Sequence, residues 1–126
     1  MIERLSWIAL GGALGSLLRY GVLVLGARWS AAGVPLAVLS VNVLGGFATG
    51  MLASLTLARG ASTDSLRLFA VIGLLGGFTT FSAFTWEGVE LLRSGAVARA
   101  AAHALAHVLL SLAAAALGIW AARGLS

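Results

Sequence analysis

The chain has 126 residues, of which 60% are hydrophobic and only 10% are charged, and 17 are glycine. A soluble domain carries about 25% charged residues, so this chain has too little polar surface to cover a water-soluble globule. Its net charge of +4 comes from arginines that are scattered singly, which excludes a nucleic-acid-binding patch. The absence of cysteine excludes disulfides and thiol chemistry. Composition therefore predicts a protein embedded in the lipid bilayer.

Charged residues divide the sequence into four apolar runs. Each run is close to the roughly 20 residues that a helix needs to cross a bilayer. Because Arg19 interrupts the first run and three similar segments follow it, that run is not expected to be a cleavable signal peptide. We expect an all-α membrane protein that forms a single domain over residues 1–126. The predicted spans are 5–27, 34–58, 66–93 and 99–122.

Arginine counts on the two sides of the membrane are nearly equal. Four spans place both termini and the second connector on one side. That side carries Arg4, Arg59, Arg67 and Arg123, whereas the other side carries Arg28, Arg93 and Arg99. The side of the membrane whose short loops carry more Lys and Arg usually faces the cytoplasm. A difference of one arginine between the two sides favours neither orientation strongly. Two interpretations stay open: another cue sets the orientation, or copies insert both ways and pair as an antiparallel dimer.

The first two spans carry small residues at intervals of four. Gly11, Gly15 and Arg19 share one face of the first span, and small residues on a face let helix backbones approach closely. An arginine inside a span either serves a function or reaches back to the headgroups, and both interpretations of Arg19 stay open. In the second span, Asn42 lies on the face of Gly46. Its amide can either bond a neighbouring helix or donate to an anion.

The third span contains adjacent glycines followed by adjacent threonines. Glycine costs about 1 kcal/mol relative to alanine in a helix interior, and threonine hydroxyls compete for backbone carbonyls. The sequence therefore predicts a helix break at Gly76–Thr80. Broken backbone at membrane depth is tolerated when it is buried in protein or lines a cavity, and it commonly marks an ion site.

Aromatic and hydroxyl residues follow the predicted break. Phe81 and Phe84 are three residues apart, as are Ser82 and Thr85, so the two kinds of side chain form neighbouring faces. Packing against lipid or core is the ordinary explanation of two phenylalanines at this spacing. Here it is weakened because they follow a break and lie beside hydroxyls.

The fourth span places His103, His107 and Ser111 on one face. The histidine pair could bind a metal, but the sequence offers no third ligand such as cysteine beside it and no H-E-x-x-H glutamate. A polar stripe along a pathway is the favoured interpretation. Because the one aspartate, Asp64, falls in a loop, no Ser-His-Asp constellation is available, and there is no phosphate-binding loop motif. We expect no enzymatic activity.

Three strings together resemble the Fluc (CrcB-type) family of fluoride channels, in order and spacing along the whole chain. They are GGALG at 11–15 with RY at 19–20, VNVLG at 41–45, and GGFTTFSAF at 76–84. The resemblance implies a fluoride-specific channel of the bacterial inner membrane that exports cytoplasmic fluoride by passive conduction. It also implies an antiparallel dual-topology homodimer with two pores. A structural sodium ion would be held at the dimer axis by the backbone carbonyls of Gly76 and Thr79.

The resemblance also assigns residues to the anion path. Its pore-lining positions correspond to Asn42, Phe81 and Phe84, and the family's Tyr-x-x-x-Ser corresponds to His107 and Ser111. Fluoride is strongly hydrated, so a pore must replace its water with hydrogen-bond donors, and the positive edge of a phenyl ring can contribute. Ser82 and Thr85 are further hydroxyl donors, while Arg19 and Glu87 are candidates for the pore vestibule.

Two other classes of protein are alternatives. A small multidrug-resistance exporter has a similar length, four spans and dual topology, but it uses a glutamate embedded in its first span. Here that glutamate is Glu3, at the extreme terminus and ahead of the run at 5–27, which argues against that class. A scaffold subunit would explain the glycines by packing but would leave the Thr-Thr break and Asn42 without a role.

Overall fold

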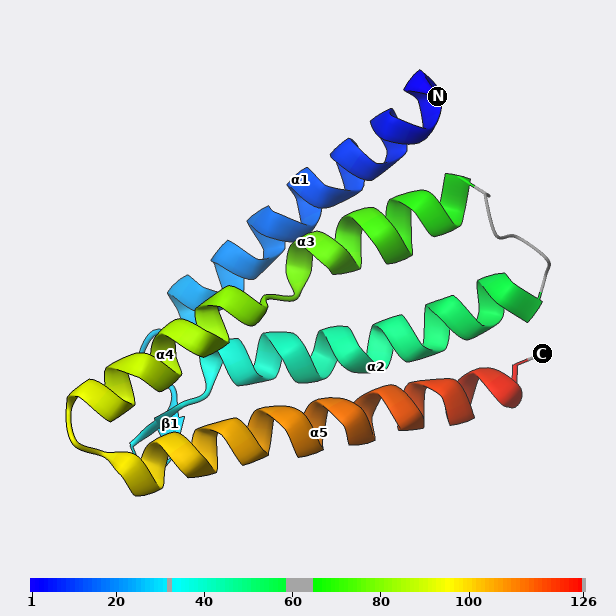
Figure 1. Ribbon diagram of the computed structural model, residues 1–126. Coiled ribbons are helices and arrows are strands. Elements are labelled where there is room, and N and C mark those ends of the chain that lie inside the picture. Colours follow the sequence, from blue (N-terminus) through cyan, green and yellow to red (C-terminus); the bar gives the residue numbers. More distant parts are fainter. Residues whose placement is uncertain (32, 59–64, 126) are drawn as a thin grey trace.

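The computed structural model describes residues 1–31, 33–58 and 65–125, which form a bundle of long helices (Figure 1). Four helical segments are long and apolar enough to cross a membrane, which confirms the predicted all-helical class. Among the described residues, the only strands are two short ones of two residues each, which pair antiparallel. The elements are α1 (Ile2–Leu25), β1 (Ser30–Ala31), β2 (Val34–Pro35), α2 (Ala37–Ala58), the π-helix η1 (Arg67–Leu75), α3 (Gly76–Phe78), α4 (Phe81–Arg93) and α5 (Val97–Arg123).

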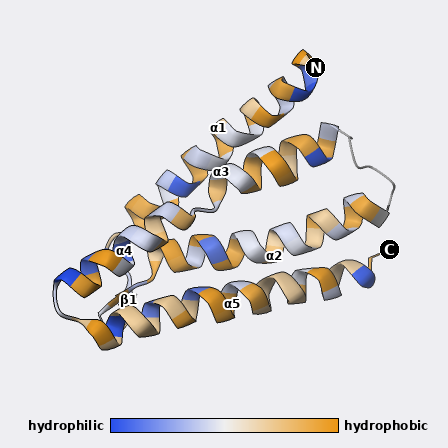
Figure 2. Ribbon diagram, in the orientation of Figure 1, coloured by the Kyte–Doolittle hydropathy of each residue, from blue (hydrophilic) through white to orange (hydrophobic). Residues whose placement is uncertain are grey.

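The helices run side by side, with α2 packed against α5 and α1 packed against η1 and α3. The two termini and the start of η1 lie at one end of the bundle, and the α4–α5 connector lies at the other (Figure 1). Hydrophobic residues colour most of the helical surface, while hydrophilic residues gather near the helix ends and at a few places inside the spans (Figure 2). This distribution suits a protein whose surroundings are lipid.

The connector between α1 and α2 is more ordered than a plain loop. Ser30–Ala31 pairs with Val34–Pro35 across a turn in which Gly33 adopts a positive φ of 78°. Because Val34 and Pro35 belong to this ribbon, α2 begins at Ala37 rather than at residue 34. The expectations for Arg59 and Asp64 concern residues outside those that the structure describes.

Glycines mark the closest helix contacts, as their spacing predicted. A Cβ atom on Gly11 would overlap the carbonyl oxygen of Phe69, and one on Gly15 would overlap that of Leu74. In α2, a Cβ on Gly50 would overlap the carbonyl oxygen of Ala115 in α5. Small residues thus let α1 approach η1, and α2 approach α5, to backbone contact.

The third membrane segment breaks at Thr79 and Thr80, a shorter stretch than the predicted Gly76–Thr80. Both threonines are extended, with ψ values of 157° and 123°, and α4 begins directly after them. Gly76 and Gly77 remain helical in α3. The prediction took both glycines as helix breakers, but Gly77 serves packing, since a Cβ there would lie 2.5 Å from the carbonyl oxygen of Gly12.

Candidate functional site

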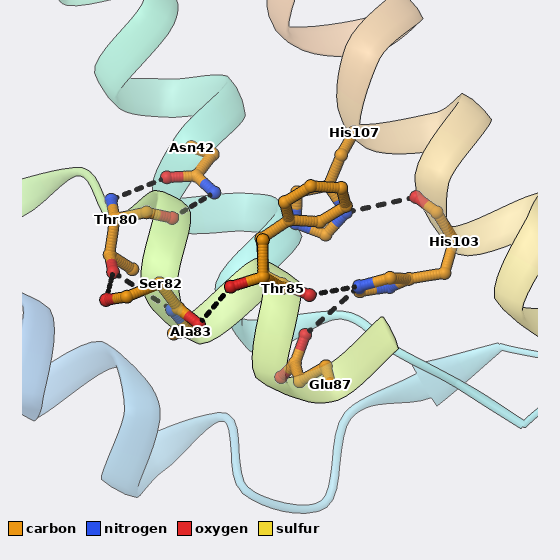
Figure 3. Close-up of polar contacts among 9 residues, drawn as sticks. Asn42, Thr80, Ser82, Ala83, Thr85, Glu87, His103 and His107 are labelled. Atoms are coloured by element: carbon orange, nitrogen blue, oxygen red, sulfur yellow. Dashed lines mark hydrogen bonds and ion pairs between the residues drawn. The ribbon is translucent and has the colours of Figure 1, made fainter. Parts of the chain in front are cut away.

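The side chain of Asn42 from α2 binds the backbone of Thr80 in the break (Figure 3). Its Oδ1 accepts a hydrogen bond from the Thr80 amide at 2.9 Å, and its Nδ2 donates to the Thr80 carbonyl, also at 2.9 Å. The bond to the Thr80 amide replaces the one that a continuous helix would have made to Gly76, whereas the bond to the Thr80 carbonyl is an additional one, because the carbonyl of an N-cap residue already accepts the first bond of its helix. An Asn amide has two N–H groups, so this arrangement leaves one N–H for another acceptor.

The remaining polar groups of the break are bonded from nearby elements. Thr80 Oγ1 accepts from the Ala83 amide at 3.2 Å and so caps the start of α4, as an N-cap residue does. Thr79 donates both its amide and its hydroxyl to the Leu75 carbonyl, at 3.0 and 2.9 Å. Arg19 Nη1 donates to the Thr79 carbonyl at 3.3 Å. The half-buried Arg19 therefore contacts the break itself.

A groove of about 500 Å³ runs along α2, the break and α5. Five predicted path residues come together in its wall: Asn42, Phe81, Phe84, His107 and Ser111. Sequence reasoning did not single out Thr49, although it lies two turns after Asn42 and also lines the groove. Most of the remaining lining is apolar or small: Gly46, Thr79, Thr80, Val108, Leu112 and Ala115.

Ser82 and Thr85 lie outside the groove lining and bond within the start of α4. Ser82 Oγ lies 3.1 Å from Thr80 Oγ1, and Thr85 Oγ1 donates to the Ser82 carbonyl at 2.9 Å (Figure 3). Both residues are exposed in the single chain. They therefore stand apart from the five residues that the groove brings together.

Aromatic rings form a continuous row beside the groove. The Phe81 and Phe84 centroids are 5.3 Å apart with their planes tilted by 52°. Phe84 stacks on His103 at 5.2 Å and lies 4.5 Å from His107. Phe81 is 74% exposed, so much of its ring has no cover within one chain.

The cluster of Glu87, His103 and His107 is a feature that the sequence interpretation missed. Ligand-capable atoms of the three side chains all lie within 4.8 Å of one another. The lack of a third ligand had argued against metal binding by the histidine pair, and Glu87 of α4 now provides one. The sequence did contain an indication of this contact. Glu87 and His103 are each eight residues from Gly95 (95 − 87 = 103 − 95), which lies in the turn between α4 and α5. Antiparallel helices joined by a short turn bring such positions together.

The carbonyls of Gly76 and Thr79 lie on either side of the last residues of α3. The Thr80 amide, which would bond the Gly76 carbonyl in a continuous helix, bonds Asn42 instead. Gly76 is exposed, and a Cβ placed there would meet nothing within 4 Å. The Thr79 carbonyl already accepts from the Arg19 guanidinium. The Gly76 carbonyl thus lacks the bond that a continuous helix would give it, and the Thr79 carbonyl faces the Arg19 guanidinium.

Comparisons with known proteins place the chain among membrane channels. Residues 6–119 match the family described as CrcB-like protein, Camphor Resistance (CrcB). The chain is 48% identical over 118 residues to the protein named "Fluoride-specific ion channel FluC" of Paracoccus denitrificans, covering 94% of this chain and 93% of that protein. Two proteins of the same name, one from Thermus thermophilus and one from Agrobacterium fabrum, are 46% and 40% identical. The alignments cover 88% of both chains for the first, and 97% of this chain and 98% of the relative for the second.

Proposed function

The chain belongs to the CrcB-like family, and on that premise we propose that it is a fluoride-specific ion channel of the bacterial inner membrane. It lets cytoplasmic fluoride leave the cell by passive conduction, which lowers fluoride toxicity. The relatives are named as ion channels rather than as enzymes, and the helices are long and apolar enough to span the membrane.

The observation that carries the proposal is the groove in which Asn42, Phe81, Phe84 and Ser111 meet. None of the described residues that line it is acidic or permanently cationic. A conducting site must bind its ion firmly enough to admit it and weakly enough to release it. Hydrogen-bond donors and ring edges satisfy both conditions, whereas a fixed cation would hold fluoride too tightly.

Each member of this set has a separate part in the passage of fluoride. The second N–H of Asn42 donates to the ion while the first stays bonded to Thr80, so the donor is held rigidly. The Ser111 hydroxyl adds a donor on the opposite helix. The edges of Phe81 and Phe84 carry partial positive charge and stabilise the ion between the donors. His107 occupies the position of the family's tyrosine and offers a ring nitrogen beside the path.

The path is completed by a second copy of the chain in an antiparallel homodimer with dual topology and two pores. In support, the groove is open along one side and Phe81 is largely uncovered in the single chain. The near-even arginine counts also permit insertion in both orientations. Arg19 and Glu87 are vestibule residues in this arrangement.

A sodium ion holds the two copies together through the Gly76 and Thr79 carbonyls. Oxygen ligands suit a hard cation, and two copies together supply four such carbonyls. The exposed Gly76 and the missing helical bond to its carbonyl support this assignment. The bond from Arg19 occupies one lone pair of the Thr79 carbonyl and leaves the other for the ion. The role of the ion is structural, because it is not itself transported.

Growth of a fluoride-sensitive bacterial strain tests the proposal. Expression of the chain should restore growth in millimolar fluoride and should leave resistance to cationic drugs unchanged. A small multidrug exporter would give the opposite pattern, and a scaffold subunit would change neither. The position of Glu3 in the first turn of α1 argues against the exporter, which needs a carboxylate deep in its first span.

A further inference from the structure

We propose that Glu87, His103 and His107 form a binding site for a divalent transition-metal ion of the zinc class, and that metal bound there blocks the anion path. The blocking effect rests on the proposed channel function, whereas metal binding does not. This site is separate from the sodium carbonyls of the break, because it is built from side chains between α4 and α5 (Figure 3).

The three side chains carry buried polar atoms without hydrogen-bond partners among the described residues. These atoms are Glu87 Oε2, His103 Nδ1 and His107 Nε2. His103 is 0% exposed and His107 is 5% exposed. Leaving a buried donor or acceptor unpaired costs about 1–3 kcal/mol, so three together call for a ligand. An ion held by Glu87 Oε2 and His107 Nε2 would pair two of these three atoms.

The hydrogen bonds of His107 already set it up as a metal ligand. Its Nδ1 lies 3.1 Å from the His103 carbonyl, and because a carbonyl only accepts, Nδ1 must carry the proton. Nε2 therefore presents a lone pair. Metal-bound histidines usually hold their other N–H against a carbonyl or carboxylate in this way, which fixes the ring orientation.

To bind the same ion, His103 must change tautomer and Glu87 must rotate. His103 Nε2 lies 3.7 Å from Glu87 Oε2 and 3.2 Å from the Phe84 carbonyl. Because a carbonyl only accepts, Nε2 now donates to the Phe84 carbonyl, so metal binding at Nε2 breaks that bond and moves the proton of the neutral ring to Nδ1. Ligands around a tetrahedral zinc ion are about 3.3 Å apart, so separations of up to 4.8 Å must shorten by rotation of side chains. Glu87 can move because its side chain is 19% exposed and flexible.

The donor set favours zinc and its neighbours over sodium, calcium or magnesium. Two imidazoles and one carboxylate form the three-ligand set of many zinc sites, in which a fourth position stays open for water or an anion. Imidazole also suits cobalt, nickel and copper. The harder cations prefer oxygen ligands alone.

The location explains why a bound metal would block fluoride. Glu87 lies six residues before the end of α4 and His103 six residues after the start of α5. Both are therefore about 9 Å along the helix axis from the connector between α4 and α5. His107 also lines the groove, and Phe84, which lines it too, contacts both histidine rings. A divalent charge there would bind fluoride at its open position and hold it, contrary to what conduction needs.

Binding is tested on the purified full-length protein by calorimetry with Zn²⁺ and by visible absorption with Co²⁺. We expect one ion per chain and the strong visible bands of tetrahedral cobalt. Glu87→Gln and His107→Gln should each lower the Zn²⁺ affinity more than about tenfold. Glu90→Gln is the matched control, because Glu90 lies on the same helix, is exposed and pairs with Arg93; it should bind like the parent. No binding by the folded parent, or an equal loss in the control, would overturn the site.

Blocking is tested by fluoride efflux from liposomes with and without Zn²⁺. Efflux by the parent should fall at least tenfold in micromolar Zn²⁺ and recover on addition of a chelator, and the Glu90→Gln control should respond equally. Unchanged efflux in a protein that binds Zn²⁺ would refute the block. If the chelated parent shows no fluoride efflux at all, the channel function fails, while the calorimetric result still decides whether the metal site exists.

Discussion

Two substitutions of Asn42 separate its role in holding the break from its role in the anion path. Asn42→Leu removes both bonds to Thr80 and puts a larger apolar side chain of similar branching in place of the amide. Asn42→Asp keeps the acceptor for the Thr80 amide and loses only the donor to the Thr80 carbonyl. The aspartate also places a negative charge in the groove wall. Asn42→Asp should therefore be more stable than Asn42→Leu but should conduct fluoride more slowly.

The sizes of the two effects follow from the contacts. Asn42→Leu leaves the Thr80 amide unpaired, which should cost about 1–3 kcal/mol, and also loses the bond to the Thr80 carbonyl, which should cost about 0.5–1.5 kcal/mol. Asn42→Asp should cost only about 0.5–1.5 kcal/mol, because the Thr80 amide stays paired and the Thr80 carbonyl still accepts the first bond of α4. An ionised carboxylate roughly 4 Å from fluoride, at an effective dielectric constant near 20, adds about 4 kcal/mol of repulsion. That energy corresponds to a rate lower by about a thousandfold.

The assay combines thermal unfolding in detergent with fluoride efflux from liposomes at equal amounts of folded protein. Asn42→Leu should be the less stable variant and Asn42→Asp the slower conductor. If flux instead fell in step with stability in both variants, Asn42 would act only by holding the break. If Asn42→Asp folded and conducted like the parent, the groove would not be the path.

Four further results are expected. Phe81→Ile and Phe84→Ile keep apolar bulk without a ring edge, so efflux should fall about tenfold or more in each, and normal efflux in both would assign them to packing. Gly50→Ala should cost about 1–3 kcal/mol in thermal unfolding, whereas Gly21→Ala, with open space around it, should cost nothing; equal effects would refute the glycine contacts. Replacing sodium by a large organic cation should lower both dimer stability and efflux, and indifference to that exchange would exclude the sodium site. C-terminal reporters specific for each side of the membrane should both be active, and activity of one alone would exclude dual topology.

Helix number and helix contacts could be predicted because they depend on short-range patterns. Runs of apolar residues define the spans, and glycines four residues apart place a smooth face on one side of a helix. The structure has Gly11, Gly15 and Gly50 in backbone contact with a neighbouring helix, as that reasoning requires. The family resemblance assigned Asn42 to the anion path together with Phe81 and Phe84, but the bonds from Asn42 to Thr80 of the broken helix were not predicted.

The extent of the break and the make-up of the cluster of Glu87 and the two histidines depend on partners distant in sequence. Whether Gly77 breaks the helix or serves helix packing depends on how closely Gly12 of α1 approaches it. That distance cannot be predicted from the helix propensity of the residues around Gly77. Glu87 is sixteen residues from His103 (103 − 87), so a search for ligands along one helix face could not find it. The short α4–α5 turn brings them together, and counting outward from Gly95 would have identified the pair.

Fluoride and chloride efflux from liposomes containing the purified protein tests the central claim most directly. Liposomes loaded with potassium salts of both anions are diluted into buffer of low potassium, with the same low sodium concentration on both sides. A potassium ionophore is then added, so that potassium leaves with the anion and no membrane potential builds up to stop efflux. A passive fluoride channel predicts rapid fluoride loss only after the ionophore, with chloride retained. Fluoride retained under these conditions, or chloride lost at the same rate, would contradict the account.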